Sequence, residues 1–155
     1  MKAKDYQATI KAKTSAEEAF QKINEVSQWW TKGFSGKASK LGDRFTVRFG
    51  ETFVDFEIAE LNPNKRIVWE VTNCNLAWIK DKTEWKGTYI VFEITKKDDK
   101  TELRFTHVGL VPALECYGAC SDGWGSYIND SLRSLITTGK GQPDRKKKGM
   151  VEKAA

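Results

Sequence analysis

Five segments between Asp43 and Gly109 alternate apolar with polar residues, so each presents one apolar face. A period of two residues is typical of strands that are covered on one side and wet on the other. The inward sets are Phe45, Val47 and Phe49; Val54, Phe56 and Ile58; Ile67, Trp69 and Val71; Ile90, Phe92 and Ile94; and Leu103, Phe105 and His107. A sheet with one continuous apolar face requires a second layer, and this need constrains the fold more than any other feature.

The predicted strands of this sheet span 43–49, 52–61, 66–72, 85–96 and 101–109. Short polar joints with Gly, Asn, Pro or Asp separate most of them, which predicts antiparallel hairpins. The exception is the longer connection 73–84, which contains Leu76, Trp78 and Ile79. Apolar residues in a loop indicate that the loop packs onto another part of the protein.

A further strand is expected over 5–13, where the same alternation occurs. Ser15 and Glu18 then have the spacing of a capping box, which predicts a helix that ends near Asn24. A second short turn precedes the loop 31–40, and it carries Val26, Trp29 and Trp30.

The segment 117–138 is the one long element left to cover the sheet. Three- and four-residue spacing gives it an apolar stripe of Tyr117, Cys120, Trp124, Ile128, Leu132 and Leu135 or Ile136. Gly139 predicts where it ends. Near its start, Gly118, Gly123 and Gly125 each cost about 1 kcal/mol relative to Ala in a helix interior. The helix is therefore either broken between 118 and 125, or its backbone closely approaches something there.

Together these elements predict an α+β fold, in which a curved antiparallel sheet wraps around a long C-terminal helix. We expect one domain over residues 1–142, followed by a basic, disordered tail over 143–155. Residues from Gly139 onward carry four of the five net positive charges of the chain. The rest of the chain is close to neutral and has no basic excess for a nucleic acid.

The sequence has no apolar run long enough to span a membrane and no apolar stretch behind its first charges, so we expect a cytoplasmic protein. An odd set of three cysteines, Cys74, Cys116 and Cys120, argues against a disulfide framework and favours buried thiols.

Several short motifs, in this order, resemble the helix-grip domains of the START-like (SRPBCC) superfamily, which includes the birch-pollen allergen. They are Trp29-Trp30, Leu41-Gly42-Asp43, Ile67-Val68-Trp69-Glu70-Val71, Trp85-Lys86-Gly87-Thr88, Phe105-Thr106-His107-Val108-Gly109-Leu110, Gly123-Trp124 and Ser131-Leu132. Within the superfamily the chain is most similar to bacterial single-domain relatives of the activator of the heat-shock chaperone ATPase. The resemblance covers about 4–142 and implies a deep apolar cavity between the sheet and the terminal helix.

We therefore predict a pocket between the sheet and the terminal helix. Its candidate residues are Trp30, Trp69, Trp78, Phe92, Phe105, His107, Tyr117, Cys120, Trp124 and Ile128. His107 is the single histidine and points inward, which favours it as the polar group of the pocket, although a lone inward histidine is more often a hydrogen-bonded structural residue. Trp78 lies in the long loop, where the mouth of a pocket would be.

No catalytic residue, metal site or cofactor is predicted. Cys116 and Cys120 with His107 lack a fourth ligand, so buried thiols are the better interpretation. Gly33, Gly36 and Gly42 are too scattered for a phosphate loop, and Asp55 with Glu57 lies on the solvent side of its strand.

Three functions stay open. The first is a non-catalytic module that binds a small apolar or aromatic molecule, oriented by His107 and Tyr117. The second is a protein-interaction module related to chaperone ATPase activators. The third is an enzyme of the cyclase, dehydratase or hydrolase kind with His107 as its acid or base. The sequence identifies neither the ligand nor the oligomeric state.

Overall fold

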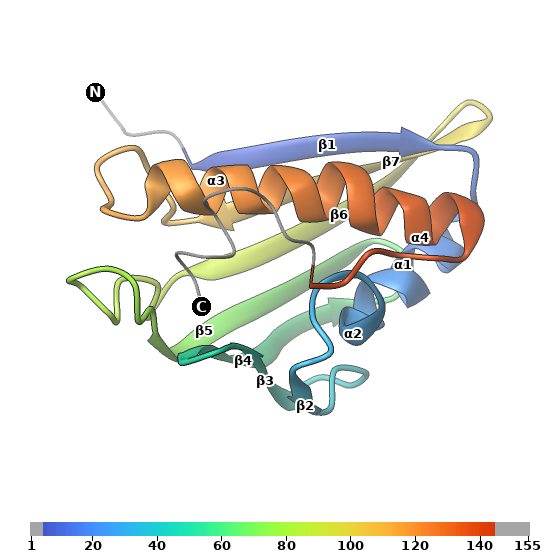
Figure 1. Cartoon of the computed structure of the whole chain (residues 1–155). Helices are drawn as coiled ribbons and strands as arrows, with labels where there is room; N and C mark the ends of the chain where they lie inside the picture. The colour runs from blue at the N-terminus through green and yellow to red at the C-terminus, as the bar shows by residue number, and fades with distance from the viewer. Residues whose placement is uncertain (1–4, 145–155) are drawn as a thin grey trace.

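The computed structural model describes residues 5–144, and these form a curved antiparallel sheet with a long C-terminal helical segment lying across its concave face (Figure 1). The seven described strands are β1 (Tyr6–Ala12), β2 (Phe34–Gly36), β3 (Arg44–Phe49), β4 (Thr52–Asn62), β5 (Arg66–Asn75), β6 (Tyr89–Lys97) and β7 (Lys100–Val108). They lie in the order β1-β7-β6-β5-β4-β3-β2. The predicted α+β helix-grip fold is confirmed.

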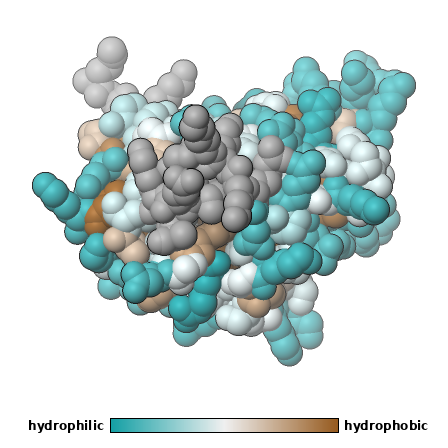
Figure 2. All heavy atoms as spheres, in the orientation of Figure 1, coloured by the Kyte–Doolittle hydropathy of each residue, from teal (hydrophilic) through white to brown (hydrophobic). Residues whose placement is uncertain are grey.

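The inward side of the sheet is the one that the alternation predicts. Every residue of the five inward sets is buried except Phe49, which is half-buried. Hydrophilic side chains cover most of the face seen in Figure 2, with small hydrophobic areas between them. Within residues 5–144, no helix combines the length and the apolar character needed to cross a membrane.

Three strand boundaries differ from the sequence prediction. The short strand β2 lies inside the segment predicted as a loop, and three residues are too few to show an alternation. β5 runs on to Asn75. β6 begins only at Tyr89, because Gly87 has a positive φ of 85° and the main chain turns there, with Thr88 N–H donating to Trp85 C=O.

The first helices confirm the capping prediction. In α1 (Ala16–Asn24), the side-chain oxygen of Ser15 accepts a hydrogen bond from the main-chain N–H of Glu18 at 3.0 Å. The short helix α2 (Val26–Trp29) follows, and it buries Trp29 completely.

The C-terminal helical segment is continuous, so its glycines do not break it. It consists of α3 (Tyr117–Ser126), the π-helical turn η1 (Tyr127–Leu132) and α4 (Arg133–Thr138). An added Cβ at Gly125 would lie 3.4 Å from the Tyr6 hydroxyl, which is an ordinary contact distance, and one at Gly118 would meet no atom within 4 Å. A close backbone approach is therefore not the reason for either glycine.

Four side chains of the wide turn η1 are buried, namely Tyr127, Ile128, Ser131 and Leu132. Tyr127 and Ser131 follow Trp124 by three and seven residues, so they lie on the same apolar stripe as Ile128 and Leu132. As predicted, the helical segment ends at Gly139, which adopts a left-handed conformation with φ of 85°.

Residues 139–144 turn back over α2. Gln142 N–H donates to the Ser131 hydroxyl at 2.7 Å, and Asp144 N–H donates to the Trp30 carbonyl at 2.8 Å. The Asp144 carboxylate also accepts from the N–H of Lys32 at 2.9 Å. Asp144 is thus bonded into the domain, two residues past the predicted boundary at 142, because its side chain finds donors that the sequence pattern does not reveal. The predicted disordered tail otherwise lies outside the described residues.

Candidate functional site

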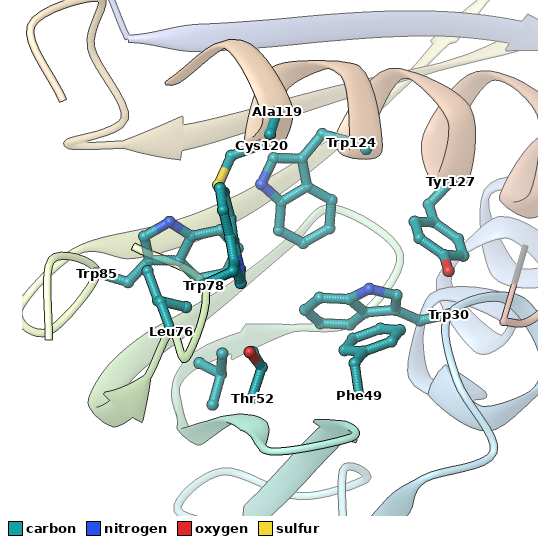
Figure 3. Close-up of a pocket in the computed structure, with 12 residues that line it drawn as sticks. Trp30, Phe49, Thr52, Leu76, Trp78, Trp85, Ala119, Cys120, Trp124 and Tyr127 are labelled. Carbon is teal, nitrogen blue, oxygen red and sulfur yellow. The ribbon is translucent and has the colours of Figure 1, made fainter. Parts of the chain in front are cut away.

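A pocket opens between α3, the connection from β5 to β6 and the first residues of β4 (Figure 3). Twelve described residues line it: Trp30, Phe49, Thr52, Val54, Leu76, Trp78, Trp85, Ala119, Cys120, Gly123, Trp124 and Tyr127. The space that the centres of water-sized molecules can occupy is about 70 Å³. At roughly 10–15 Å³ for each water, this is room for a few waters or for one small organic group.

The lining is aromatic and uncharged. Six of the twelve side chains carry aromatic rings, and none of the twelve is a Lys, Arg, Asp or Glu. Of the polar groups, the Thr52 hydroxyl accepts a hydrogen bond from Ala77 N–H at 3.0 Å. Such a surface favours a ligand with little need for hydrogen bonds, since an unpaired buried polar group costs about 1–3 kcal/mol.

Five of the six aromatic rings form a continuous chain of contacts. The ring centroids of Trp85 and Trp124 are 5.8 Å apart, and those of Trp124 and Trp30 are 4.8 Å apart. Phe49 continues the chain at 6.1 Å from Trp30 and 6.4 Å from Tyr127. These rings support one another and form one rigid wall of the pocket.

Trp78 lies across the pocket from Trp30 (Figure 3). It is half-buried and belongs to the connection between β5 and β6, whose Leu76 and Ile79 are buried in the core. These two side chains explain why apolar residues occur in this loop. The expectation that Trp78 lies at the pocket agrees with this position.

Two carboxylates join the loop that carries Trp78 to the residues just before α3 by reciprocal hydrogen bonds. The Glu115 carboxylate accepts from the main-chain N–H groups of Lys80 and Asp81 at 3.0 and 3.2 Å. These bonds lower the pKa of Glu115. In the opposite direction, the Glu84 carboxylate accepts from the N–H groups of Glu115 and Cys116 at 2.7 and 3.1 Å. The loop that carries Trp78 is therefore fixed to the start of α3.

His107 lies behind this wall and does not line the pocket. Its Nδ1 accepts a hydrogen bond from the Trp124 indole N–H at 3.0 Å. Because an indole nitrogen only donates, Nδ1 carries no proton, and Nε2 must donate to the Thr88 hydroxyl 2.9 Å away. That hydroxyl in turn donates to Trp85 C=O at 2.6 Å. Burial lowers the pKa of His107 to about 3, so the imidazole is neutral.

Both ring nitrogens of His107 are thus engaged inside the protein. A general base must reach the proton that it removes, and His107 reaches only Trp124 and Thr88. The position accords with a structural histidine. It does not support His107 as the polar group of the pocket or as an acid or base.

The three cysteines are buried or half-buried thiols without a disulfide. Trp85 donates its indole N–H to Cys116 Sγ at 3.2 Å, and Cys74 Sγ lies 3.6 Å from the carbonyl oxygen of Lys82. Burial raises the pKa of Cys74, and it raises that of Cys120 far above its ordinary value. Over residues 5–144, no three His, Cys, Asp or Glu side chains gather as a metal site.

The structure brings together four of the ten candidate residues in the pocket, namely Trp30, Trp78, Cys120 and Trp124. The other six lie outside the lining: Trp69, Phe92, Phe105, His107 and Ile128 are fully buried in the core, and Tyr117 is partly buried against it. The alternation identifies these side chains as inward-facing, but it does not distinguish a residue that fills the core from one that faces a cavity. Ligand contact stays a prediction for all ten.

The sequence prediction missed eight lining residues: Phe49, Thr52, Val54, Leu76, Trp85, Ala119, Gly123 and Tyr127. Phe49 and Val54 were in the inward sets, and Gly123 was among the glycines expected at a close approach. Trp85 was assigned to a strand, although it lies in the turn before β6. Tyr127 follows Trp124 by three residues, so helical spacing counted from Trp124 could have identified it.

Comparison with known proteins identifies a family over most of the chain. The model of the family described as activator of Hsp90 ATPase homolog 1-like protein matches residues 18–137. No curated protein matches the chain.

Solved structures share the fold. The solution structure of the Aha1 dimer from Colwellia psychrerythraea is 27% identical, with a TM-score of 0.73 over 89% of this chain and 99% of that chain. CalU16 from Micromonospora echinospora is 12% identical, with a TM-score of 0.66 over 98% of this chain and 82% of that chain. MLL2253 from Mesorhizobium loti is 18% identical, with a TM-score of 0.64 over 84% of this chain and 95% of that chain. The last two comparisons bear on the fold alone.

Proposed function

The chain belongs to the family of activator of Hsp90 ATPase homolog 1-like proteins, and from this premise we propose that it is a cytoplasmic, non-catalytic module that binds a small molecule with an apolar surface. The observation that carries the proposal is the lining of the pocket, which has six aromatic side chains and no charged one. Apolar surface that leaves water here contributes about 25 cal/mol per Å² to binding.

Several side chains of the pocket are already held in place without a ligand. Trp85 and Trp124 are held by their hydrogen bonds to Cys116 and His107, and ring contacts support Trp30. A preformed site loses little side-chain freedom on binding, so more of the contact energy appears as affinity. Because the lining also lacks a nucleophile beside a base, binding fits it better than catalysis.

Native mass spectrometry of freshly purified full-length protein tests this function by detecting a retained small molecule. A second measurement uses benzene as a simple apolar probe and follows the indole N–H signals by NMR. We expect the signals of Trp30, Trp78, Trp85 and Trp124 to shift on titration.

The matched variants for this test are Ala119→Phe and Leu41→Ala. Ala119 lines the pocket, so a phenyl ring there should fill the space and abolish the shifts. Leu41 is 65% exposed and lies outside the lining, so its replacement should leave them intact. If no small molecule is retained and benzene shifts none of these signals, the proposed function is refuted.

A second candidate function is interaction with a protein, and the family description suggests a chaperone of the Hsp90 type. On the solvent side of the sheet, Tyr89 and Val108 lie directly opposite each other on β6 and β7, and both are exposed. Exposed neighbouring apolar side chains are a typical feature of a protein contact.

Pull-down with purified Hsp90 tests this candidate. We expect the double variant Tyr89→Ser and Val108→Ser to weaken capture, and Ala119→Phe to leave it unchanged. No capture of Hsp90 by the unmodified protein would count against this function.

A further inference from the structure

We propose that the group held in the pocket is a methylated ammonium ion, such as a trimethylammonium head. This inference rests on the proposed function, because it names the ligand class for the same pocket. Three features carry it: the arrangement of the rings, the lack of free hydrogen-bond donors on two of them, and the sign of the charge at the rim.

The rings surround the space from several sides. Trp78 stands on one side, with Trp124 above and Trp30 below and opposite it (Figure 3). The planes of Trp30 and Trp124 are inclined by 43°. A flat ligand favours two parallel faces, whereas a compact, rounded group can touch ring faces in several directions. A cation near the faces of Trp, Tyr or Phe is attracted by their electron-rich π systems.

The indole N–H groups of Trp85 and Trp124 are already used inside the protein. They donate to Cys116 Sγ and to Nδ1 of His107. A ligand group that needs donors would remain unsatisfied against these rings, at a cost of about 1–3 kcal/mol. A quaternary ammonium has no N–H and accepts no hydrogen bond, and its methyl groups present an apolar surface. Donation by the indole N–H also increases the electron density of the ring, which strengthens attraction to a cation.

The charge next to the rim also favours a cation. The Glu84 carboxylate is held at the start of α3 by Cys116 N–H, 3.1 Å away. Burial is the main cause of the raised pKa of the Cys120 thiol, which lines the pocket, and the negative charge of Glu84 adds to it. The nearby ammonium of Lys82 is turned to the carbonyl oxygens of Ala77 and Ile79, at 3.0 Å from each, and does not line the pocket.

The size of the space agrees with a single methylated head. About 70 Å³ is available to the centres of water-sized molecules. This space can admit a small rounded group, and the rest of the ligand would extend past the half-buried Ala119 and Trp78 to solvent.

The test compares two probes of the same shape that differ in charge. Choline carries a quaternary nitrogen, and 3,3-dimethylbutan-1-ol has a carbon atom in its place. Titration of the full-length protein, followed by calorimetry and by the indole N–H signals, gives both dissociation constants. We expect choline to bind about tenfold more tightly, because a partly desolvated cation gains this much from aromatic faces.

The variant Trp78→Leu removes one π face and keeps an apolar side chain. Since Trp78 is half-buried at the rim, thermal unfolding should be close to that of the unmodified protein. We expect the preference for choline over its neutral isostere to fall about threefold or more. Leu41→Ala is the matched control and should leave the preference unchanged.

Each outcome supports or overturns the inference. Equal affinity for the two probes, or binding of benzene but of neither probe, would overturn the methylated ammonium and leave the proposed function standing. An unchanged preference in a folded Trp78→Leu protein would also overturn it. No binding of choline, its isostere or benzene, together with no retained molecule, would refute both.

Discussion

The indole N–H of Trp124 donates to Nδ1 of His107 across 3.0 Å, and this bond fixes both the tautomer of the histidine and the orientation of a pocket ring. A buried imidazole that accepts such a bond on one side and donates to Thr88 on the other is stable only in its neutral form. The single histidine therefore supports the wall of the pocket from behind.

Protonation of His107 should destabilise the folded protein. Its pKa is about 3 in the folded state, below the usual 6.5, so below pH 6.5 the unfolded chain binds the proton and the folded protein does not. The folded protein therefore keeps its full free energy of unfolding above pH 6.5 and loses part of it as the pH falls from 6.5 toward 3. We expect the free energy of unfolding to decrease by up to about 1.4 kcal/mol per pH unit.

Urea denaturation between pH 5 and 7 measures this slope, and His107→Gln is the comparison because glutamine does not titrate. The variant should have a shallower slope over this range, whatever its stability at pH 7. Parallel slopes for the two proteins would contradict a depressed pKa at His107.

Two fully buried tryptophans should respond differently to replacement by phenylalanine. The indole N–H of Trp29 donates to Ile23 C=O at 3.0 Å, whereas Nε1 of Trp69 has no hydrogen-bond partner among residues 5–144. Trp29→Phe loses this bond in addition to ring volume, and Trp69→Phe loses ring volume only. We expect Trp29→Phe to cost about 1–3 kcal/mol more, measured as the free energy of unfolding in urea. Equal losses would show that Nε1 of Trp69 is satisfied in solution.

Replacement of two glycines by alanine should change stability in opposite directions. An added Cβ at Gly118 meets no atom within 4 Å, so Gly118→Ala should raise stability by up to about 1 kcal/mol through helix propensity. At Gly141 the Cβ would clash with the carbonyl oxygen of Gln28, so Gly141→Ala should lower the melting temperature. Thermal unfolding of both variants tests this, and a stable Gly141→Ala protein would mean that residues 139–144 do not pack against α2.

Glu115 should protect the main-chain N–H groups of Lys80 and Asp81 from hydrogen exchange. Glu115→Ala removes their acceptor, so these two amides should exchange faster in NMR measurements. Glu84→Ala is the reciprocal control, since it removes the acceptor of the Glu115 and Cys116 amides instead. The same exchange pattern in both variants would argue against two separate carboxylate contacts.

Local pattern alone was enough to predict the fold. The two-residue alternation identified which side chains of β3 to β7 face inward, and Ser15 with Glu18 located the start of α1. The alternation missed β2, which is too short to alternate, and it placed the start of β6 four residues too early, because the turn at Gly87 delays that strand.

The pocket was predicted only in part, for a physical reason. Trp30, Trp78, Cys120 and Trp124 line it, yet Trp69 and Phe105, which the pattern places on the same inner face, are completely buried beneath. Alternation reports the side of a strand on which a residue lies. It does not report what packs opposite that residue, which depends on the curvature of the sheet and on the path of the helix over it.

By itself, then, the sequence determined the sheet, its inner face and the helix that covers it, because these follow from hydrophobic periodicity and capping between near neighbours. Only the tertiary structure decided that Tyr127 lines the pocket, that Trp85 becomes part of the wall, and that His107 is enclosed behind Trp124. Each of these depends on contacts between residues far apart in the chain. A packed interior selects such contacts by shape and hydrogen bonding, and no local pattern encodes them.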